Sequence, residues 1–344
     1  MAATAVAAEA AAPTSSPDSV TTARRLSAFG TTAGVPAPFS DRLAALVEER
    51  RSQIVLGLDP DPGALWPSAV ERTAEDDSEE TAFLTARAVV RHCCTAIEAA
   101  GPACVAVKLQ AACFERLGAS GWNALRDVGA IARSHGLLAI ADVKRGDVPV
   151  TARAYAQALV GETPGPYGAV DGLGADAFTA NPLLGRDSLE PLVDAAASAG
   201  AGCFVLVRTS NPGAVEVQDA AAPERPLHEL LARMVHELGA GSIADSGLSA
   251  VGAVTGATRP ELLARLRGLM PNAIFLMPGV GAQGGSVEGL AAAFAPHPAA
   301  GLVAASRSIV DAYSERGGDP AAAAAVAAEE LRAETWSTSA GHGC

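Results

Sequence analysis

The segment DVKRGD, residues 142–147, holds residues whose types and spacing could do chemistry. It ends a β-rich apolar run, in which alternate side chains share a face, so Asp142 and Lys144 should point the same way. Because opposite charges favour the ionised form, a lysine with acidic neighbours stays charged and fixed in place. Such a lysine could protonate a developing carbanion, while the negative charge of an aspartate repels an anionic group that leaves the substrate. An ordinary strand-end salt bridge is the alternative for this segment alone.

Two further charged residues lie at the ends of neighbouring apolar runs. Asp59 is the last residue of the run 54–59, and Lys108 is the residue before the last of the run 103–109. If these runs are parallel strands of a barrel, their carboxyl ends meet on one face, where barrel active sites are built. Either charge alone would be interpreted as solvated, but together they favour one polar cluster.

A glycine-rich segment, PGVGAQGG at 278–285, could bind phosphate. Glycines lack a Cβ, so backbone N–H groups can close around an anion, and Gln283 can donate a further hydrogen bond. Arg307 ends the last apolar run and can grip phosphate through its guanidinium fork. Loops after the seventh and eighth strands hold phosphate in many barrels. A glycine-rich turn without a ligand is the alternative.

The chain that must position these residues alternates short apolar runs with helical patterns, as parallel strands joined by crossover helices do. Helix candidates include residues 81–100 and 259–269, and Pro149, Pro191 and Pro260 are expected near helix starts. A doubly wound open sheet is the structural competitor, but it usually has fewer strands, and no dinucleotide fingerprint follows the first run. We therefore predict a single-domain (β/α)8 TIM barrel over residues 41–335, with strands in the runs 54–59, 103–109, 137–144, 175–181, 203–210, 248–254, 273–279 and 301–307.

The two ends of the chain lack the alternation of strand and helix patterns that the middle shows. Residues 1–40 are rich in Ala, Thr, Ser and Pro without a sustained hydrophobic period, which predicts a mobile N-terminal tail, and residues 336–344 are expected to form a C-terminal tail. A secretory signal is not expected, since a basic start is missing and Glu9 interrupts the apolar stretch. A transit peptide stays open because acids are scarce and Arg24 and Arg25 are adjacent. We expect a cytoplasmic protein.

Composition excludes several classes of function. The net charge of −13 argues against a nucleic-acid partner, because phosphate backbones demand a basic surface. No window reaches the roughly 18 consecutive apolar residues of a membrane span. The six cysteines lack the paired spacing of a zinc or redox site and are expected to be reduced thiols.

Several segments occur together in an order that carries a family resemblance. They are LGLDP, VAVKLQAACFE, ADVKRGD with the following threonine, ANPLLG, RTSNPGA, TGAT and PGVGAQGG. From about Phe39 to about Ala312, the chain resembles the bacterial type 2 branch of the orotidine 5'-monophosphate decarboxylases. The combination of DxKxxDxxxT with PGxGAQGG is far more specific than either part.

The resemblance implies decarboxylation of orotidine 5'-monophosphate to uridine 5'-monophosphate, the last step of de novo pyrimidine synthesis, without a cofactor or metal. Lys144 would protonate carbon 6 of the pyrimidine, Asp142 would lie beside the substrate carboxylate, and Lys108 would continue the chain of alternating charges. Asp147 and Thr151 would come from the neighbouring subunit, Asp147 closing that chain and Thr151 contacting the ribose region. A homodimer with shared active sites is therefore implied.

The resemblance also implies the substrate contacts. Asp59 would bind a ribose hydroxyl, and Ser210 would contact and recognise the pyrimidine ring. Gln283 and Arg307 would grip the phosphate, with Gly284 in the same substrate-binding loop. The acidic insert at 71–80 and the last residues fall outside the match, and no orotate phosphoribosyltransferase segment is evident.

Two other functions stay open. A magnesium-dependent sugar-phosphate enzyme of the same barrel superfamily, such as a hexulose-phosphate synthase, would share the DxKxxD strand, but the PGVGAQGG loop argues against it. A catalytically silent barrel that binds a phosphate ligand is the second, and the intact set of Asp142, Lys144 and Asp147 argues against it.

Overall fold

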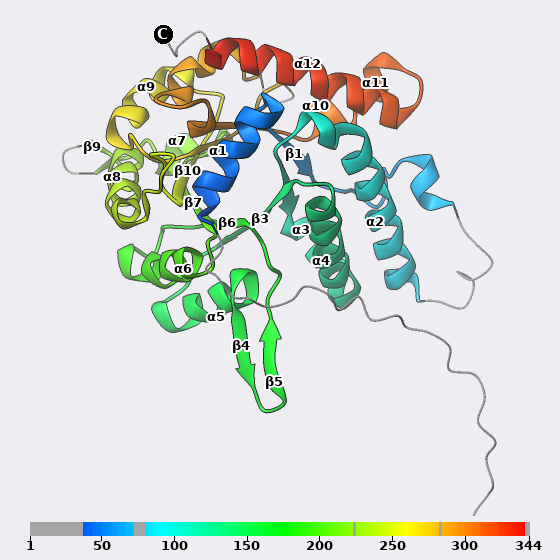
Figure 1. Ribbon diagram of the computed structural model, residues 1–344, viewed down its shortest axis with the longest axis horizontal. Helices are drawn as coiled ribbons and strands as arrows, with labels where there is room; N and C mark the ends of the chain where they lie inside the picture. Colours follow the sequence, from blue (N-terminus) through cyan, green and yellow to red (C-terminus); the bar gives the residue numbers. More distant parts are fainter. Residues whose placement is uncertain (1–36, 72–79, 223–224, 282–283, 341–344) are drawn as a thin grey trace, which may run out of the picture. The chain divides into compact units, whose positions relative to one another are not determined.

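The computed structural model describes residues 37–71, 80–222, 225–281 and 284–340. A closed barrel of parallel strands lies at its centre, with helices around it (Figure 1). The predicted (β/α)8 barrel is confirmed, and each of the predicted runs overlaps one strand. In order around the barrel the strands are β1 (Ile54–Leu58), β12 (Gly301–Ala305), β11 (Phe275–Pro278), β10 (Val251–Thr255), β7 (Gly202–Arg208), β6 (Ala177–Ala180), β3 (Leu138–Arg145) and β2 (Ala106–Gln110).

The helices follow the strands in the alternation that the sequence predicts. The predicted helices at 81–100 and 259–269 correspond to α2 and α9. The α-helices are α1 (Phe39–Arg50), α2 (Thr81–Ala100), α3 (Ala111–Glu115), α4 (Gly118–Ser134), α5 (Pro149–Val160), α6 (Arg186–Ser198), α7 (Ala214–Val217), α8 (Leu227–Gly239), α9 (Pro260–Leu269), α10 (Arg307–Val310), α11 (Tyr313–Arg316) and α12 (Pro320–Ala340). Short 3-10 helices are η1 (Pro67–Val70), η3 (Gly101–Ala103), η4 (Ala240–Ser242), η5 (Glu288–Phe294) and η6 (Pro298–Ala300).

Two of the three prolines expected near helix starts do begin a helix. Pro149 and Pro260 begin α5 and α9, as predicted. The expectation for Pro191 is wrong, because α6 already begins at Arg186 and Pro191 lies inside it. Gly185, with φ 96°, turns the chain directly before that helix, so the helix start is set by this glycine and not by the proline.

Two antiparallel hairpins interrupt the connections between barrel strands. One joins β4 (Glu162–Gly165) to β5 (Gly168–Asp171) between α5 and β6, and it projects from the barrel (Figure 1). The other joins β8 (Ala221–Ala222) to β9 (Arg225–Pro226) before α8. Among the described residues, no helix combines the length and the apolar character needed to span a bilayer.

Alternation along the strands divides the core into two layers. On β1, Ile54 and Leu56 belong to the larger cluster, which includes buried residues of the surrounding helices, whereas Val55 belongs to an inner cluster. Helix α1 adds Phe39 and Leu43 to the inner cluster, together with residues from the starts of several strands. This helix therefore closes the amino-terminal end of the barrel and leaves the carboxyl-terminal end open for a site.

The predicted barrel limits of 41 and 335 are too narrow. Phe39 and Ser40 are buried in α1, and α12 continues to Ala340. Gln53 Nε2 donates a buried hydrogen bond to Ser339 Oγ at 2.6 Å. The apolar residues of α12 are mostly alanines spread around the helix, so the sequence offers little periodicity from which to find its end. The rest of the two predicted tails, 1–36 and 341–344, lies outside the described residues.

Ending the chain after Thr335 should therefore destabilise the barrel. The truncation removes Trp336, which packs against the inner cluster, and leaves Gln53 without the hydroxyl of Ser339. We expect the free energy of unfolding to fall by on the order of 2 to 4 kcal/mol, measured by thermal or denaturant unfolding. A chain ending after Ala340 is the matched control and should unfold like the full chain. Equal stability of both truncations would contradict a structural role for 336–340.

Candidate active site

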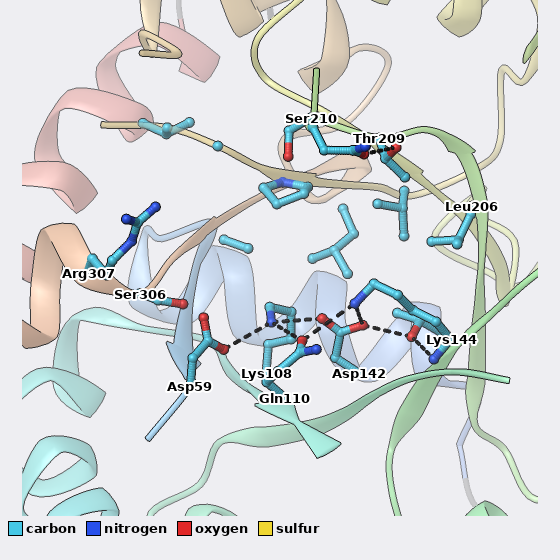
Figure 2. A pocket seen from close by; sticks show the side chains of 18 of the residues that line it. Asp59, Lys108, Gln110, Asp142, Lys144, Leu206, Thr209, Ser210, Ser306 and Arg307 are labelled. Carbon is cyan, nitrogen blue, oxygen red and sulfur yellow. Dashed lines mark hydrogen bonds and ion pairs between the residues drawn. The ribbon is translucent and has the colours of Figure 1, made fainter. Parts of the chain in front are cut away.

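Four charged side chains form a row at the carboxyl ends of β1, β2 and β3. Asp59 Oδ1 lies 3.5 Å from Lys108 Nζ, which donates to Asp142 Oδ2 at 2.8 Å. Asp142 Oδ1 in turn accepts a hydrogen bond from Lys144 Nζ at 2.6 Å. The charges alternate along the row, as the sequence analysis expects (Figure 2). These are the only two lysines in the chain.

Burial and the neighbouring charges shift the pKa values of two residues in this row. Burial disfavours the charged form of Asp142, but Lys108 and Lys144 outweigh it and lower the pKa of Asp142 to about 2. Burial also disfavours the Lys108 ammonium, but the carboxylates of Asp142 and Asp59 outweigh it and raise the pKa of Lys108. Asp142 is therefore an anion and Lys108 a cation at neutral pH. The Lys144 side chain is 41% exposed, whereas that of Lys108 is 9% exposed.

The row lies along one wall of a cavity of 450 Å³, within the roughly 300 to 1,000 Å³ usual for small-molecule sites. Arg307 lies beyond the Asp59 end of the row, while Ser210 and Thr209 face the row from the opposite wall (Figure 2). Six of the residues singled out from the sequence line this cavity: Asp59, Lys108, Asp142, Lys144, Ser210 and Arg307.

Asp147 and Thr151 do not line the cavity of their own chain. Asp147 follows β3, where its Oδ1 accepts a hydrogen bond from the backbone N–H of Val148 at 2.7 Å. Thr151 lies exposed in the first turn of α5, next to Val150, which is 81% exposed. The structure thus leaves the predicted roles of Asp147 and Thr151 untested within a single chain.

The glycine-rich turn after β11 is folded on itself. The N–H groups of Gly281, Gly284 and Gly285 donate to carbonyls of Gly285, Gly281 and Gly279. In this conformation the N–H of Gly284 is therefore not available to a phosphate, and its predicted contact stays a prediction. Gln283 lies outside the described residues.

Arg307 begins α10, directly after β12, and shares this end of the cavity with Ser306, Ser308 and Gly279. Among the described residues, no carboxylate forms a salt bridge with its guanidinium, whereas both lysines of the row are paired. Asp311 is near enough to interact with this guanidinium electrostatically, but a guanidinium that forms no salt bridge at a cavity edge can still receive an anion from solution, as a phosphate site requires.

Comparison with known proteins agrees with this geometry. Residues 52–325 match the protein family described as Orotidine 5'-phosphate decarboxylase / HUMPS family. The chain belongs to this family.

Individual relatives cover most of the chain. An orotidine 5'-phosphate decarboxylase of Rhodopirellula baltica is 39% identical over 278 residues, which is 80% of this chain and 89% of the relative. The solved structure of Leishmania donovani OMP decarboxylase superposes with a TM-score of 0.64 at 32% identity, covering 87% of this chain and 99% of that one. Leishmania donovani UMP synthase, of which the chain spans only 57%, gives a TM-score of 0.63 at 32% identity.

Two polar residues that line the cavity beside the lysines, Gln110 and Thr179, were not predicted from the sequence. Gln110 Oε1 lies within hydrogen-bonding distance of both ammonium groups, 3.5 Å from Lys108 Nζ and 3.4 Å from Lys144 Nζ. The strand alternation that links Asp142 with Lys144 also puts Gln110 on the face of Lys108, so this signal was present in the sequence. Thr179 on β6 is the other, and it carried no comparable signal, because its neighbours in the sequence are apolar.

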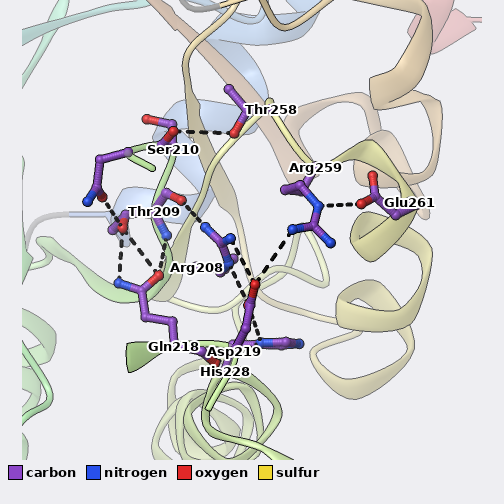
Figure 3. A network of polar contacts seen from close by, with 10 residues as sticks. Arg208, Thr209, Ser210, Gln218, Asp219, His228, Thr258, Arg259 and Glu261 are labelled. Carbon is purple, nitrogen blue, oxygen red and sulfur yellow. Dashed lines mark hydrogen bonds and ion pairs between the residues drawn. The ribbon is translucent and has the colours of Figure 1, made fainter. Parts of the chain in front are cut away.

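A partly buried network of polar side chains holds the loop that follows β7 (Figure 3). Arg208, only 4% exposed, donates to both carboxylate oxygens of Asp219, from Nε at 2.8 Å and from Nη2 at 3.1 Å. The backbone N–H of Thr209 donates to Gln218 Oε1 at 2.7 Å, and Gln218 Nε2 donates back to Thr209 Oγ1 at 2.9 Å. His228 Nδ1 faces two acceptors, the Gln218 carbonyl and Asp219, so this nitrogen carries the proton. The two ends of the loop are thereby joined.

The same network holds Ser210 against the loop after β10. Thr258 Oγ1 donates to the carbonyl of Ser210 at 3.4 Å, and Arg259 Nη1 lies 3.6 Å from Asp219 Oδ2. A Cβ at Gly256 would lie 2.8 Å from the backbone of Ser210, so only glycine allows this close approach. Ser210, predicted to read the pyrimidine, is therefore placed by contacts that no sequence pattern reveals.

Proposed function

We propose that the protein decarboxylates orotidine 5'-monophosphate to uridine 5'-monophosphate. The observation that carries this proposal is the row of alternating charges, with Lys108 and Asp142 buried at its centre, that ends at Lys144 on the wall of a cavity. Family membership and relatives named orotidine 5'-phosphate decarboxylase support it independently. A site for this nucleotide must bind the phosphate at one end and act on the base at the other. The cavity has Arg307 at one end and Lys144 at the other.

The substrate would lie along the row of charges. Its phosphate would bind at Arg307, with Gln283 adding a contact, and its ribose would approach Asp59. Gly284 would join the phosphate contacts only after its N–H leaves the carbonyl of Gly281. The pyrimidine would then lie between Ser210 and Lys144. This orientation puts carbon 6 and its carboxylate beside Asp142, at the end of the row away from Arg307.

The reaction follows from the charges at that end. The anionic Asp142 disfavours a substrate carboxylate beside it, and the strain is relieved when the bond from carbon 6 to the carboxylate breaks and carbon dioxide leaves. The electron pair stays on carbon 6, where the Lys144 ammonium stabilises it and donates a proton. Leu206, Val254 and Leu276 line the cavity as well, and apolar walls strengthen these interactions by excluding water.

We further propose a homodimer in which each cavity is completed by the partner. Asp147 and Thr151 lie outside their own cavity but directly after the strand that carries Lys144. The exposed apolar side chains of Val148 and Val150 beside them are suited to burial in an interface. In such a dimer, Asp147 would extend the row of charges beyond Lys144.

A cytoplasmic location is also part of the proposal. Five of the six cysteines lie in the described part of the chain, and all five are free thiols, as is usual in reducing compartments: Cys93, Cys94, Cys104, Cys113 and Cys203.

The test is to follow the loss of orotidine monophosphate absorbance with and without a metal chelator. We expect equal turnover in both conditions, with uridine monophosphate as the product. A chelator-sensitive activity on a sugar phosphate would favour the hexulose-phosphate synthase alternative. Binding of uridine monophosphate without any turnover would favour a silent phosphate-binding barrel.

Replacing Arg307 with alanine should weaken the use of substrate by several kcal/mol, since charge-assisted contacts with the phosphate would be lost. At about 1.4 kcal/mol per tenfold, kcat/KM should fall by on the order of a hundredfold or more. The comparison substrate is orotidine without its phosphate. If Arg307→Ala loses as much activity on orotidine as on the nucleotide, Arg307 does not bind phosphate.

A further inference from the structure

The pairing of β3 with β6 is interrupted at the reactive residues. Ala141 pairs with Phe178, and the next pair along the strands is Arg145 with Ala180. The residues 142–144 of β3 therefore face a single residue of β6, Thr179. Bulges of this kind bend a strand and re-aim its side chains, and they are frequent beside active sites.

Lys144 takes an unusual backbone conformation in this bulge. Its φ is 47°, one of only two positive values at non-glycine residues in the described chain. A left-handed residue in a bulge loses its regular partner in the ladder, so its N–H needs another acceptor. Such strain persists only where the surroundings hold it in place.

The Thr179 hydroxyl supplies that acceptor. Its Oγ1 accepts a hydrogen bond from the backbone N–H of Lys144 at 2.9 Å and donates to Asp142 Oδ1, also at 2.9 Å. The same Asp142 oxygen accepts from Lys144 Nζ at 2.6 Å. One buried hydroxyl, in a residue that is 1% exposed, thus joins the backbone of the lysine to its carboxylate partner.

We infer that Thr179 is a positioning residue for the proton transfer, an inference that rests on the proposed decarboxylation. Because the anionic carboxylate of Asp142 can only accept, the Thr179 hydroxyl donates its proton to Asp142 Oδ1 while its oxygen accepts from the Lys144 N–H. Asp142 is then held by Lys108 on one oxygen and by Thr179 and Lys144 on the other. The hydroxyl fixes the strained Lys144 backbone and the Asp142 carboxylate together, and so it sets where the ammonium points.

Substitutions that separate the hydroxyl from the shape of the side chain test this inference. Thr179→Val keeps the branched shape and removes the hydroxyl, whereas Thr179→Ser keeps the hydroxyl. We expect Thr179→Val to lower kcat by at least about tenfold while the Kd for uridine monophosphate changes less than about threefold, because the phosphate and ribose contacts are elsewhere. Thr179→Ser should stay within a few-fold of the wild type.

Lysine NMR gives a readout that does not depend on turnover. With only two lysines in the chain, protein labelled at lysine Cε should show one signal each for Lys108 and Lys144. We expect Thr179→Val to shift the Lys144 signal and Thr179→Ser to leave it near its wild-type position. If Thr179→Val is too unstable to purify, Thr179→Ala takes its place in both measurements, with the same expected results.

Two outcomes would overturn the role of Thr179. One is a hydroxyl-free variant with wild-type kcat and an unmoved Lys144 signal, and the other is a Thr179→Ser protein as impaired as Thr179→Val. If the wild-type protein does not turn over orotidine monophosphate, the proposed function itself is contradicted. In that case the NMR comparison still decides whether Thr179 places Lys144.

Discussion

Lys144→Ala protein should form no measurable uridine monophosphate from orotidine monophosphate, yet it should still bind uridine monophosphate. The ammonium lies at one end of the row of charges and hydrogen-bonds to the anionic Asp142. Its removal leaves carbon 6 without a cation to stabilise the electron pair and without an acid to protonate it. Arg307 and Ser210, which are expected to contact the phosphate and the base, are untouched.

Lys144→Arg is the matched control, since it keeps a cation next to Asp142. A guanidinium holds its proton in proteins, so this variant offers charge without an effective acid. We expect it to bind uridine monophosphate and to turn over far more slowly than the wild type. The rates are measured from the loss of substrate absorbance, and binding is measured by calorimetry. Near-normal turnover by Lys144→Ala would contradict the mechanism proposed here.

The sequence predicted the barrel and the row of charges because both depend on local patterns. Regular strand alternation predicts that Asp142 and Lys144 share one face, and a parallel barrel predicts that Asp59 and Lys108 meet at the same end. Thr179 could not be found in this way. Its role depends on a three-to-one bulge between strands, and register irregularities leave no mark on hydrophobic periodicity.

Other parts of the site depend on contacts between distant segments. Ser210 was predicted from a resemblance, but its position depends on contacts between distant side chains. Thr258 donates a hydrogen bond to its carbonyl, while Gln218 and Asp219 bond to the two preceding residues, Thr209 and Arg208. Such pairings are set by tertiary geometry, in which single side chains from different loops meet. The end of α12 was missed for a simpler reason, because an alanine-rich helix has a weak apolar stripe.

Asp147→Ala protein should be nearly inactive alone, yet it should regain activity when mixed with Lys144→Ala protein. We expect each variant alone to lose at least about a hundredfold in kcat/KM, as the loss of a charged group at a reacting centre usually does. In a hybrid of the proposed dimer, one cavity receives Lys144 from one chain and Asp147 from the other. That cavity is wild type in both positions, while the second cavity carries both defects.

The size of the recovery follows from symmetry. After random exchange of equal amounts, half of the dimers are hybrids with one intact cavity each, so activity should approach about a quarter of the wild-type value. Exchange is checked by mass spectrometry, with one variant carrying a tag. If Asp147 instead serves the cavity of its own chain, every cavity in the mixture carries one defect. Confirmed hybrids without recovered activity would therefore rule out a shared site.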